Sequence, residues 1–167
     1  LGQIHLWLGL CEEQLHNDTT AADHFVTAME KDTAVAAKIS SNEQWQYLAW
    51  TSLISATRAK YNLEAYDSAL SYALAALKVD PSKSQTYALV ANIYSALKRY
   101  DDMRATAEDL LKLDAGAPEA MSLLGLYFLQ KPDNLWPTPE AMAARWDSTA
   151  HYYDQAIAAY EKLSLIH

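Results

Sequence analysis

Length, composition and charge narrow the class of this protein before any motif is considered. Its 167 residues are 51% hydrophobic, and only four glycines and five prolines interrupt them. This is enough material for one domain with a core, and the shortage of turn residues favours long helices, so an all-α fold is predicted. The formal net charge is −8 and no run of lysine or arginine occurs, which argues against nucleic acid or an anionic membrane surface as partner.

The chain carries no clear targeting signal. No stretch reaches the roughly 20 apolar residues that cross a bilayer, so no membrane insertion is expected. The opening LGQIHLWLGLCEE lacks the basic start of a signal peptide and begins inside a predicted helix, so we expect a fragment. High tyrosine and tryptophan content with few lysines is compatible with an exported or periplasmic bacterial protein, and the cytoplasm stays open.

Hydrophobic patterns and cap signals predict eight helices. Ser41 or Asn42 is the expected N-cap of the third, because either side chain can accept from the free amides of a helix start. Thr138 before Pro139 predicts another N-cap, and a loop is expected over about residues 131–137. The predicted helices are about 2–16, 19–38, 43–62, 66–79, 84–97, 100–113, 118–130 and 139–165.

Two segments of the chain repeat each other at a fixed offset. YDSALSYALAALKVD, starting at Tyr66, realigns with YDDMRATAEDLLKLD, starting at Tyr100. A period of this length, about 34 residues, indicates stacked helix pairs. Gly9 and Gly125 are predicted to lie where paired helices approach closely, because a glycine inside a helix costs about 1 kcal/mol relative to alanine and needs a packing reason.

The period and the recurring residues resemble the tetratricopeptide repeat (TPR) family. The matching positions are Leu8, Gly9, Ala21, Phe25 and Ala28; Tyr66, Ala69, Ala73, Ala76 and Pro81; Tyr87, Val90, Ala91 and Tyr94; Leu124, Gly125, Phe128, Tyr153, Ala156, Tyr160 and Leu163. The resemblance implies a right-handed superhelical solenoid of antiparallel helix pairs, with the first helix of each pair on the concave face. We predict a single repeat domain over 1–167, with about four TPR-like units at about 2–38, 43–83, 84–117 and 118–167 and an insertion at about 131–149.

The sequence offers little for catalysis or metal binding. Cys11 is the only cysteine, so paired thiolates cannot build a zinc site. None of the five histidines has a second histidine four residues away, and adjacent carboxylates on a helix point in different directions. We therefore expect no catalytic residue, no metal and no cofactor, and the chain is not expected to be an enzyme.

The predicted concave face carries apolar and amide side chains. Asn92 occupies a position of the clamp with which some TPR proteins hold a terminal carboxylate, but the accompanying lysines are missing, so that clamp is disfavoured. Amides can pair with an extended peptide backbone while apolar residues supply contact area. The candidate ligand-binding residues are Arg58, Tyr61, Asn62 and Asn92. Alternatively, a flanking element covers this face.

The predicted function is a non-enzymatic scaffold that binds a protein or peptide. Trp136, flanked by prolines in the insertion, is a candidate partner anchor, because long loops on rigid scaffolds often carry function. It could equally fold back as a plug over the last helices. Two alternatives remain: a structural spacer or self-association (dimerisation) module of a larger, exported bacterial protein, and an accessory subunit of a multi-protein assembly.

Overall fold

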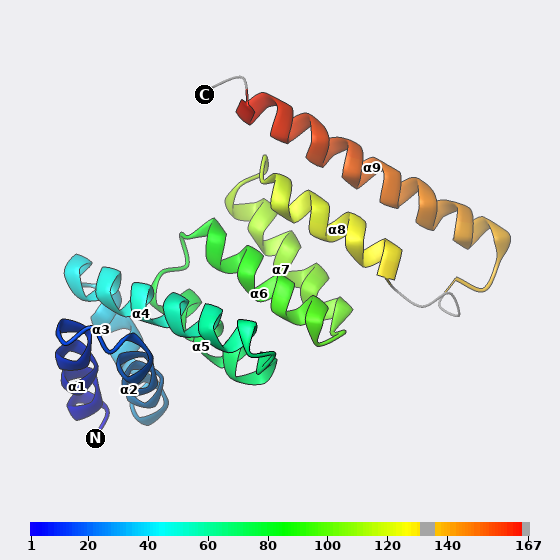
Figure 1. Ribbon diagram of the computed structural model, residues 1–167. Coiled ribbons are helices and arrows are strands. Elements are labelled where there is room, and N and C mark those ends of the chain that lie inside the picture. Colours follow the sequence, from blue (N-terminus) through cyan, green and yellow to red (C-terminus); the bar gives the residue numbers. More distant parts are fainter. Residues whose placement is uncertain (131–135, 165–167) are drawn as a thin grey trace. The chain divides into compact units, whose positions relative to one another are not determined.

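The fold is built from helices. A computed structural model describes residues 1–130 and 136–164, and all regular secondary structure in these ranges is helical, which confirms the predicted all-α class (Figure 1). The elements are α1 (Gly2–Gln14), α2 (Asp18–Lys31), α3 (Ala34–Ser40), α4 (Glu43–Asn62), α5 (Tyr66–Val79), α6 (Ser84–Ala96), α7 (Tyr100–Leu113), α8 (Pro118–Gln130) and α9 (Pro139–Ser164).

Contacts between the helices divide the chain into two compact units, Leu1–Thr86 and Tyr87–His167, with the boundary near the start of α6. In the first unit α1 lies antiparallel along α2, and α4 along α5 (Figure 1). In the second unit α8 packs on both α7 and α9. Each unit thus buries the apolar stripes of consecutive helices against one another, as helical repeats do.

The predicted helix over 19–38 is wrong, because the chain breaks after α2. Asp32 leaves the helix with φ −152° and ψ 104°, and its Oδ1 accepts the backbone N–H of Ala34 at 3.0 Å. A short aspartate side chain that binds a nearby amide competes with continued helix. The chain then forms the short helix α3, which buries Val35 and Ile39. The described residues therefore contain nine helices rather than eight.

The ends of the second helices reveal the repeat in three dimensions. In the first three pairs the second helix, α2, α5 or α7, ends at an aspartate with extended backbone, whose Oδ1 accepts the N–H two residues further on; the three are Asp32, Asp80 and Asp114. Asp80 and Asp114 are separated by one repeat period, whereas the stretch from Asp32 to Asp80 is longer. The additional length accommodates α3, so the predicted period and the longer first spacing have one explanation.

The turns inside the helix pairs repeat in the same way. The turns within the first three pairs each have one non-glycine residue in the left-handed region, and the next residue donates its N–H to the carbonyl five positions back, which is the Schellman cap. The left-handed residues are His16 (φ 60°), Glu64 (φ 58°) and Lys98 (φ 59°). This conformation costs an L-residue about 1 kcal/mol.

The two helical glycines lie at close approaches, as predicted. A Cβ added to Gly9 would lie 2.8 Å from Cε1 of Phe25, and one added to Gly125 would lie 3.0 Å from Cε2 of Tyr153. Both distances are shorter than an ordinary van der Waals contact. The aromatic ring of the partner helix thus lies in the space that a side chain would fill, and the overlap is more severe at Gly9 than at Gly125.

Two predicted caps are confirmed. Oδ1 of Asn42, rather than the Ser41 side chain, accepts the N–H of Trp45 at 3.0 Å at the start of α4. Oγ1 of Thr138 accepts the N–H of Ala141 at 3.1 Å, and Pro139 begins α9. Most of the predicted loop, over 131–135, and the predicted helix end at Leu165 lie outside the described residues.

Arg145 joins the last two helices. Its side chain is 4% exposed, Nη2 donates to the carbonyl of Leu129 at 2.7 Å, and Nε donates to the carbonyl of Phe128. These are carbonyls of the last turn of α8, which lack partners inside the helix. A cation at this end also interacts favourably with the helix dipole. Arg145 therefore caps α8 from α9.

Candidate functional site

Two pockets open at equivalent positions of first helices, one in each unit. In the first unit, four residues of α4 line the α4 pocket: Thr51, Ile54, Ser55 and Arg58. In the second unit, four residues of α8 line the α8 pocket: Glu119, Ser122, Leu123 and Leu126. Taken in order, the members of the two sets are separated along the chain by two repeat periods. The repeat therefore presents the same helix face in both pockets.

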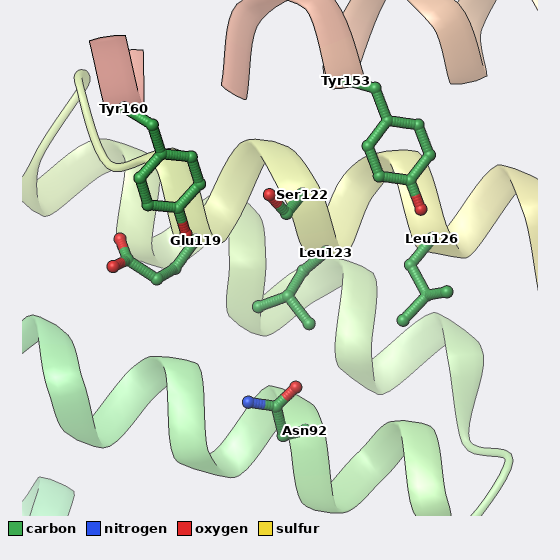
Figure 2. Close-up of a pocket in the computed structure, with 7 residues that line it drawn as sticks. All are labelled: Asn92, Glu119, Ser122, Leu123, Leu126, Tyr153 and Tyr160. Carbon is green, nitrogen blue, oxygen red and sulfur yellow. The ribbon is translucent and has the colours of Figure 1, made fainter. Parts of the chain in front are cut away.

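The α8 pocket has a volume of about 290 Å³ and receives side chains from three helices (Figure 2). Leu123 and Leu126 point into it from α8, and the rings of Tyr153 and Tyr160 reach toward it from α9. The two tyrosines lie two helical turns apart and so share a face of α9. The Asn92 amide approaches from α6, opposite the tyrosines (Figure 2).

The charge of the α8 pocket is one-sided. Among the described residues that line it, Glu119 is the only acidic one, and none is basic. Glu119 is exposed, and no ion pair engages it in the described part of the chain. Tyr160 lines the same pocket from α9 (Figure 2). The pocket thus combines an apolar floor, two phenol rings and one negative charge.

The α4 pocket is larger, at about 450 Å³, and more balanced in charge. Arg58 and Asp18 both line it, together with Trp50 and Gln85. The indole of Trp50 is fixed, because Nε1 donates to Oγ1 of Thr86 at 3.0 Å and Nζ of Lys83 lies 5.6 Å from the ring centroid. This pocket therefore offers a fixed aromatic wall and one side chain of each sign.

Of the four predicted ligand-binding residues, two line a pocket and two do not. Arg58 lines the α4 pocket and Asn92 the α8 pocket. Tyr61 and Asn62 line neither pocket: the ring of Tyr61 packs edge-on against Tyr66, with 5.3 Å between centroids, and Asn62 is exposed at the end of α4. A single site that contains all four residues stays a prediction.

Trp136 lies half-buried against α8. Its ring centroid is 6.1 Å from that of Phe128, which in turn stacks on Tyr152 at 5.8 Å. Nε1 of Trp136 is shielded from solvent and has no hydrogen-bond partner among residues 1–130 and 136–164. These contacts favour the plug interpretation of Trp136 over an exposed anchor, and its role in partner binding stays a prediction.

Sequence reasoning missed the residues that complete the two pockets. The sequence places Trp50, Tyr153 and Tyr160 on helices, but it does not predict which cavity they line, because that depends on the neighbouring helix. The spacing of Tyr153 and Tyr160 was the one available signal, since it places both on one face of a helix.

Two further side-chain pairs cross between helices of the first unit. Nδ1 of His5 lies 3.2 Å from Nδ1 of His24, although no group of three or more His, Cys, Asp or Glu side chains in the described ranges is placed to hold a metal. The Tyr72 hydroxyl donates to Oδ1 of Asp23. Burial, together with this hydrogen bond and the charge of Asp23, raises the pKa of Tyr72 to about 12.

None of the described helices is long and apolar enough to cross a membrane.

Solved structures share this fold. A crystal structure of MamA is 15% identical, with a TM-score of 0.57 over 98% of this chain and 80% of that one; a second MamA structure is 12% identical, with a TM-score of 0.53 over 98% and 93%. A candidate protein-binding protein from Bacteroides ovatus is 14% identical, with a TM-score of 0.56 over 99% and 96%. No family model matches the sequence, and no curated protein does. At these identities the likeness concerns the fold, and together with the repeat period it shows that the chain has a tetratricopeptide-like fold of repeated helix pairs.

Proposed function

We propose that this chain is a non-catalytic scaffold that binds a protein or peptide segment along the first helices of its pairs. The observation that carries the proposal is the recurrence of a pocket at the same helix positions in both units. Repeat proteins use such a face as an extended binding surface. The likeness in fold to a candidate protein-binding protein supports the same class of function.

The chemistry of the pockets suits a peptide. Ile54, Leu123 and Leu126 supply apolar area, while Gln85 and Asn92 supply amides that can pair with an extended backbone. The net charge of −8 disfavours nucleic acid, which needs clustered cations to neutralise phosphates. A protein or peptide segment is therefore the proposed partner.

The test is a selection of random peptides displayed on phage against the whole chain, followed by affinity measurements with the selected peptides. An Arg58→Glu, Asn92→Ala double variant changes one residue of each pocket. We expect it to weaken binding about tenfold, because each pocket loses a polar contact. Lys60→Glu reverses a charge on α4 outside the α4 pocket and serves as the control. Equal affinity of the double variant and the unchanged chain would overturn the proposal.

Self-association is the second candidate, because α1 and its C-cap Leu15 expose apolar side chains. Ile4, Trp7, Leu8 and Leu15 are 58%, 53%, 41% and 67% exposed, and they recur at helical spacing. Exposed apolar side chains gathered on one helix often mark an interaction site. Sedimentation velocity at increasing concentration tests this: a dimer that Ile4→Lys and Leu15→Lys abolish would favour the self-association module, and a monomer at all concentrations would exclude it.

A further inference from the structure

We infer that the α8 pocket holds the arginine side chain of a partner protein. This inference rests on the proposed function and specifies its ligand chemistry in the second unit. The pocket volume of about 290 Å³ lies just below the roughly 300–1,000 Å³ of small-molecule sites. A space of this size suits one long side chain and its adjoining backbone better than a cofactor.

The apolar part of the pocket matches the stem of such a side chain. Leu123 and Leu126 point into the space between α8, α9 and α6 (Figure 2). Arginine buries its methylene stem along apolar surface while its charged head keeps polar contacts. The two leucines therefore supply the surface on which the stem lies.

The head of the side chain meets two features that favour a cation. The phenol rings of Tyr153 and Tyr160 line the pocket, and the electron-rich face of an aromatic ring attracts a cation. The carboxylate of Glu119 lines the same pocket as Tyr160 and has no ion-pair partner in the described part of the chain (Figure 2). A guanidinium ion is planar, stacks on aromatic rings and binds a carboxylate with two parallel hydrogen bonds.

Nothing in the described lining repels a cation. The other polar side chains, Asn92 and Ser122, are neutral and can hydrogen-bond the backbone on either side of the bound residue. The chain as a whole carries a net charge of −8, which steers basic segments toward it. A terminal carboxylate or a phosphate is disfavoured for the same reason, because Glu119 would repel it.

The experiment is a titration of the isotope-labelled chain, followed by two-dimensional ¹H–¹⁵N NMR, with three blocked single amino acids. They are the N-acetyl N-methylamides of arginine, citrulline and norleucine. Citrulline has nearly the shape of arginine without its charge, and norleucine keeps only the apolar stem. We expect saturable shifts at the Asn92 side-chain amide and along α8, with citrulline binding about tenfold more weakly than arginine.

Variants separate the role of Glu119 from a general effect of charge. Glu119→Gln removes the carboxylate of an exposed residue, so the fold is retained, and we expect the arginine and citrulline affinities to become equal within about twofold. Glu161→Gln removes an exposed carboxylate of α9 outside the pocket, and the preference for arginine should persist there.

The inference is overturned if norleucine binds the pocket as tightly as arginine, if the three ligands shift other residues, or if none binds. Each of these results leaves the proposed function intact, because the peptide selection tests the whole chain and includes the α4 pocket. Failure of that selection together with arginine binding would instead limit the function to recognition of a single basic side chain.

Discussion

The first and last helix pairs solve one packing problem with different residues. In the first pair the ring of Phe25, which is fully buried, lies over Gly9. In the last pair the half-buried ring of Tyr153 lies over Gly125 and lines a pocket. The same close approach thus closes a core in one pair and forms the wall of a cavity in the other.

The two middle pairs place smaller residues at the corresponding positions. Thr57 and Ala91 replace the glycines, and Ala73 and Ala107 replace the rings. All four are fully buried. Because protein interiors are close-packed, a larger residue on one helix requires a smaller one on its partner. The end pairs therefore set an aromatic ring against a glycine, whereas the middle pairs bring two small residues together.

Removing the aromatic ring should reveal the largest difference in stability between the first and the last helix pair. Phe25→Ala is expected to cost about 3–4 kcal/mol in free energy of unfolding, because it leaves a cavity in a closed core. Tyr153→Ala should cost about 1–2 kcal/mol, since water already reaches part of that ring. Urea denaturation of both variants measures the difference. Equal losses would show that Tyr153 is packed as tightly as Phe25.

Arg145→Met should produce the next largest effect, and only in the last pair. The methionine keeps an apolar stem but leaves the carbonyls of Phe128 and Leu129 without this donor, so we expect a loss of about 2–3 kcal/mol. Arg104→Met is the control, because Arg104 pairs with Glu108 on an exposed helix surface and its loss should cost about 0–1 kcal/mol. Similar losses in the two variants would contradict the capping role.

Adding a methyl group at each glycine sharpens the comparison. Gly9→Ala should destabilise by about 1–2 kcal/mol, because its Cβ would overlap the enclosed ring of Phe25. Gly125→Ala should be nearly neutral, since the Tyr153 ring can move slightly and alanine gains about 1 kcal/mol of helix propensity. Thermal unfolding of both variants tests this order, and a larger loss for Gly125→Ala would reverse our description of the two pairs.

The turn of the first pair should tolerate glycine with a gain in stability. His16 is exposed and adopts φ 60°, so His16→Gly is expected to stabilise by about 0.5–1 kcal/mol by removing left-handed strain. His16→Ala keeps the strain and is the control. A gain of the same size in the alanine variant would attribute the effect to the histidine side chain instead of the backbone.

The smallest effect at neutral pH concerns Tyr72, which links α5 to Asp23 of the first pair. Its pKa of about 12 in the folded chain lies above the ordinary value of 10.0. The folded state therefore holds the phenol proton more tightly, and this contribution is present below pH 10 and lost as the pH rises toward 12. We expect urea stability to fall more steeply from about pH 10 to 12 in the unchanged chain than in Tyr72→Phe; parallel curves would exclude the linkage.

Local signals account for the parts of the fold that were predicted from the sequence. The helices at 43–62, 66–79, 100–113 and 118–130 begin and end where expected. Their limits follow from caps such as Asn42 and from apolar spacing, both of which act within a few residues. The break at Asp32 was missed because residues 34–40 are rich in alanine and contain no glycine or proline, while the hydrogen bond between Asp32 and the N–H of Ala34 appears only in the structure.

The sequence by itself determined that this protein is a helical repeat with a fixed period and glycines at its close approaches. Periodicity and glycine placement are properties of neighbouring residues, so they can be read along the chain. Only the tertiary structure decided that Tyr153 and Tyr160 wall a pocket over Leu123 and that Arg145 caps α8. Each of these contacts joins residues that are separated along the chain, and which of them meet depends on how α9 packs against α8.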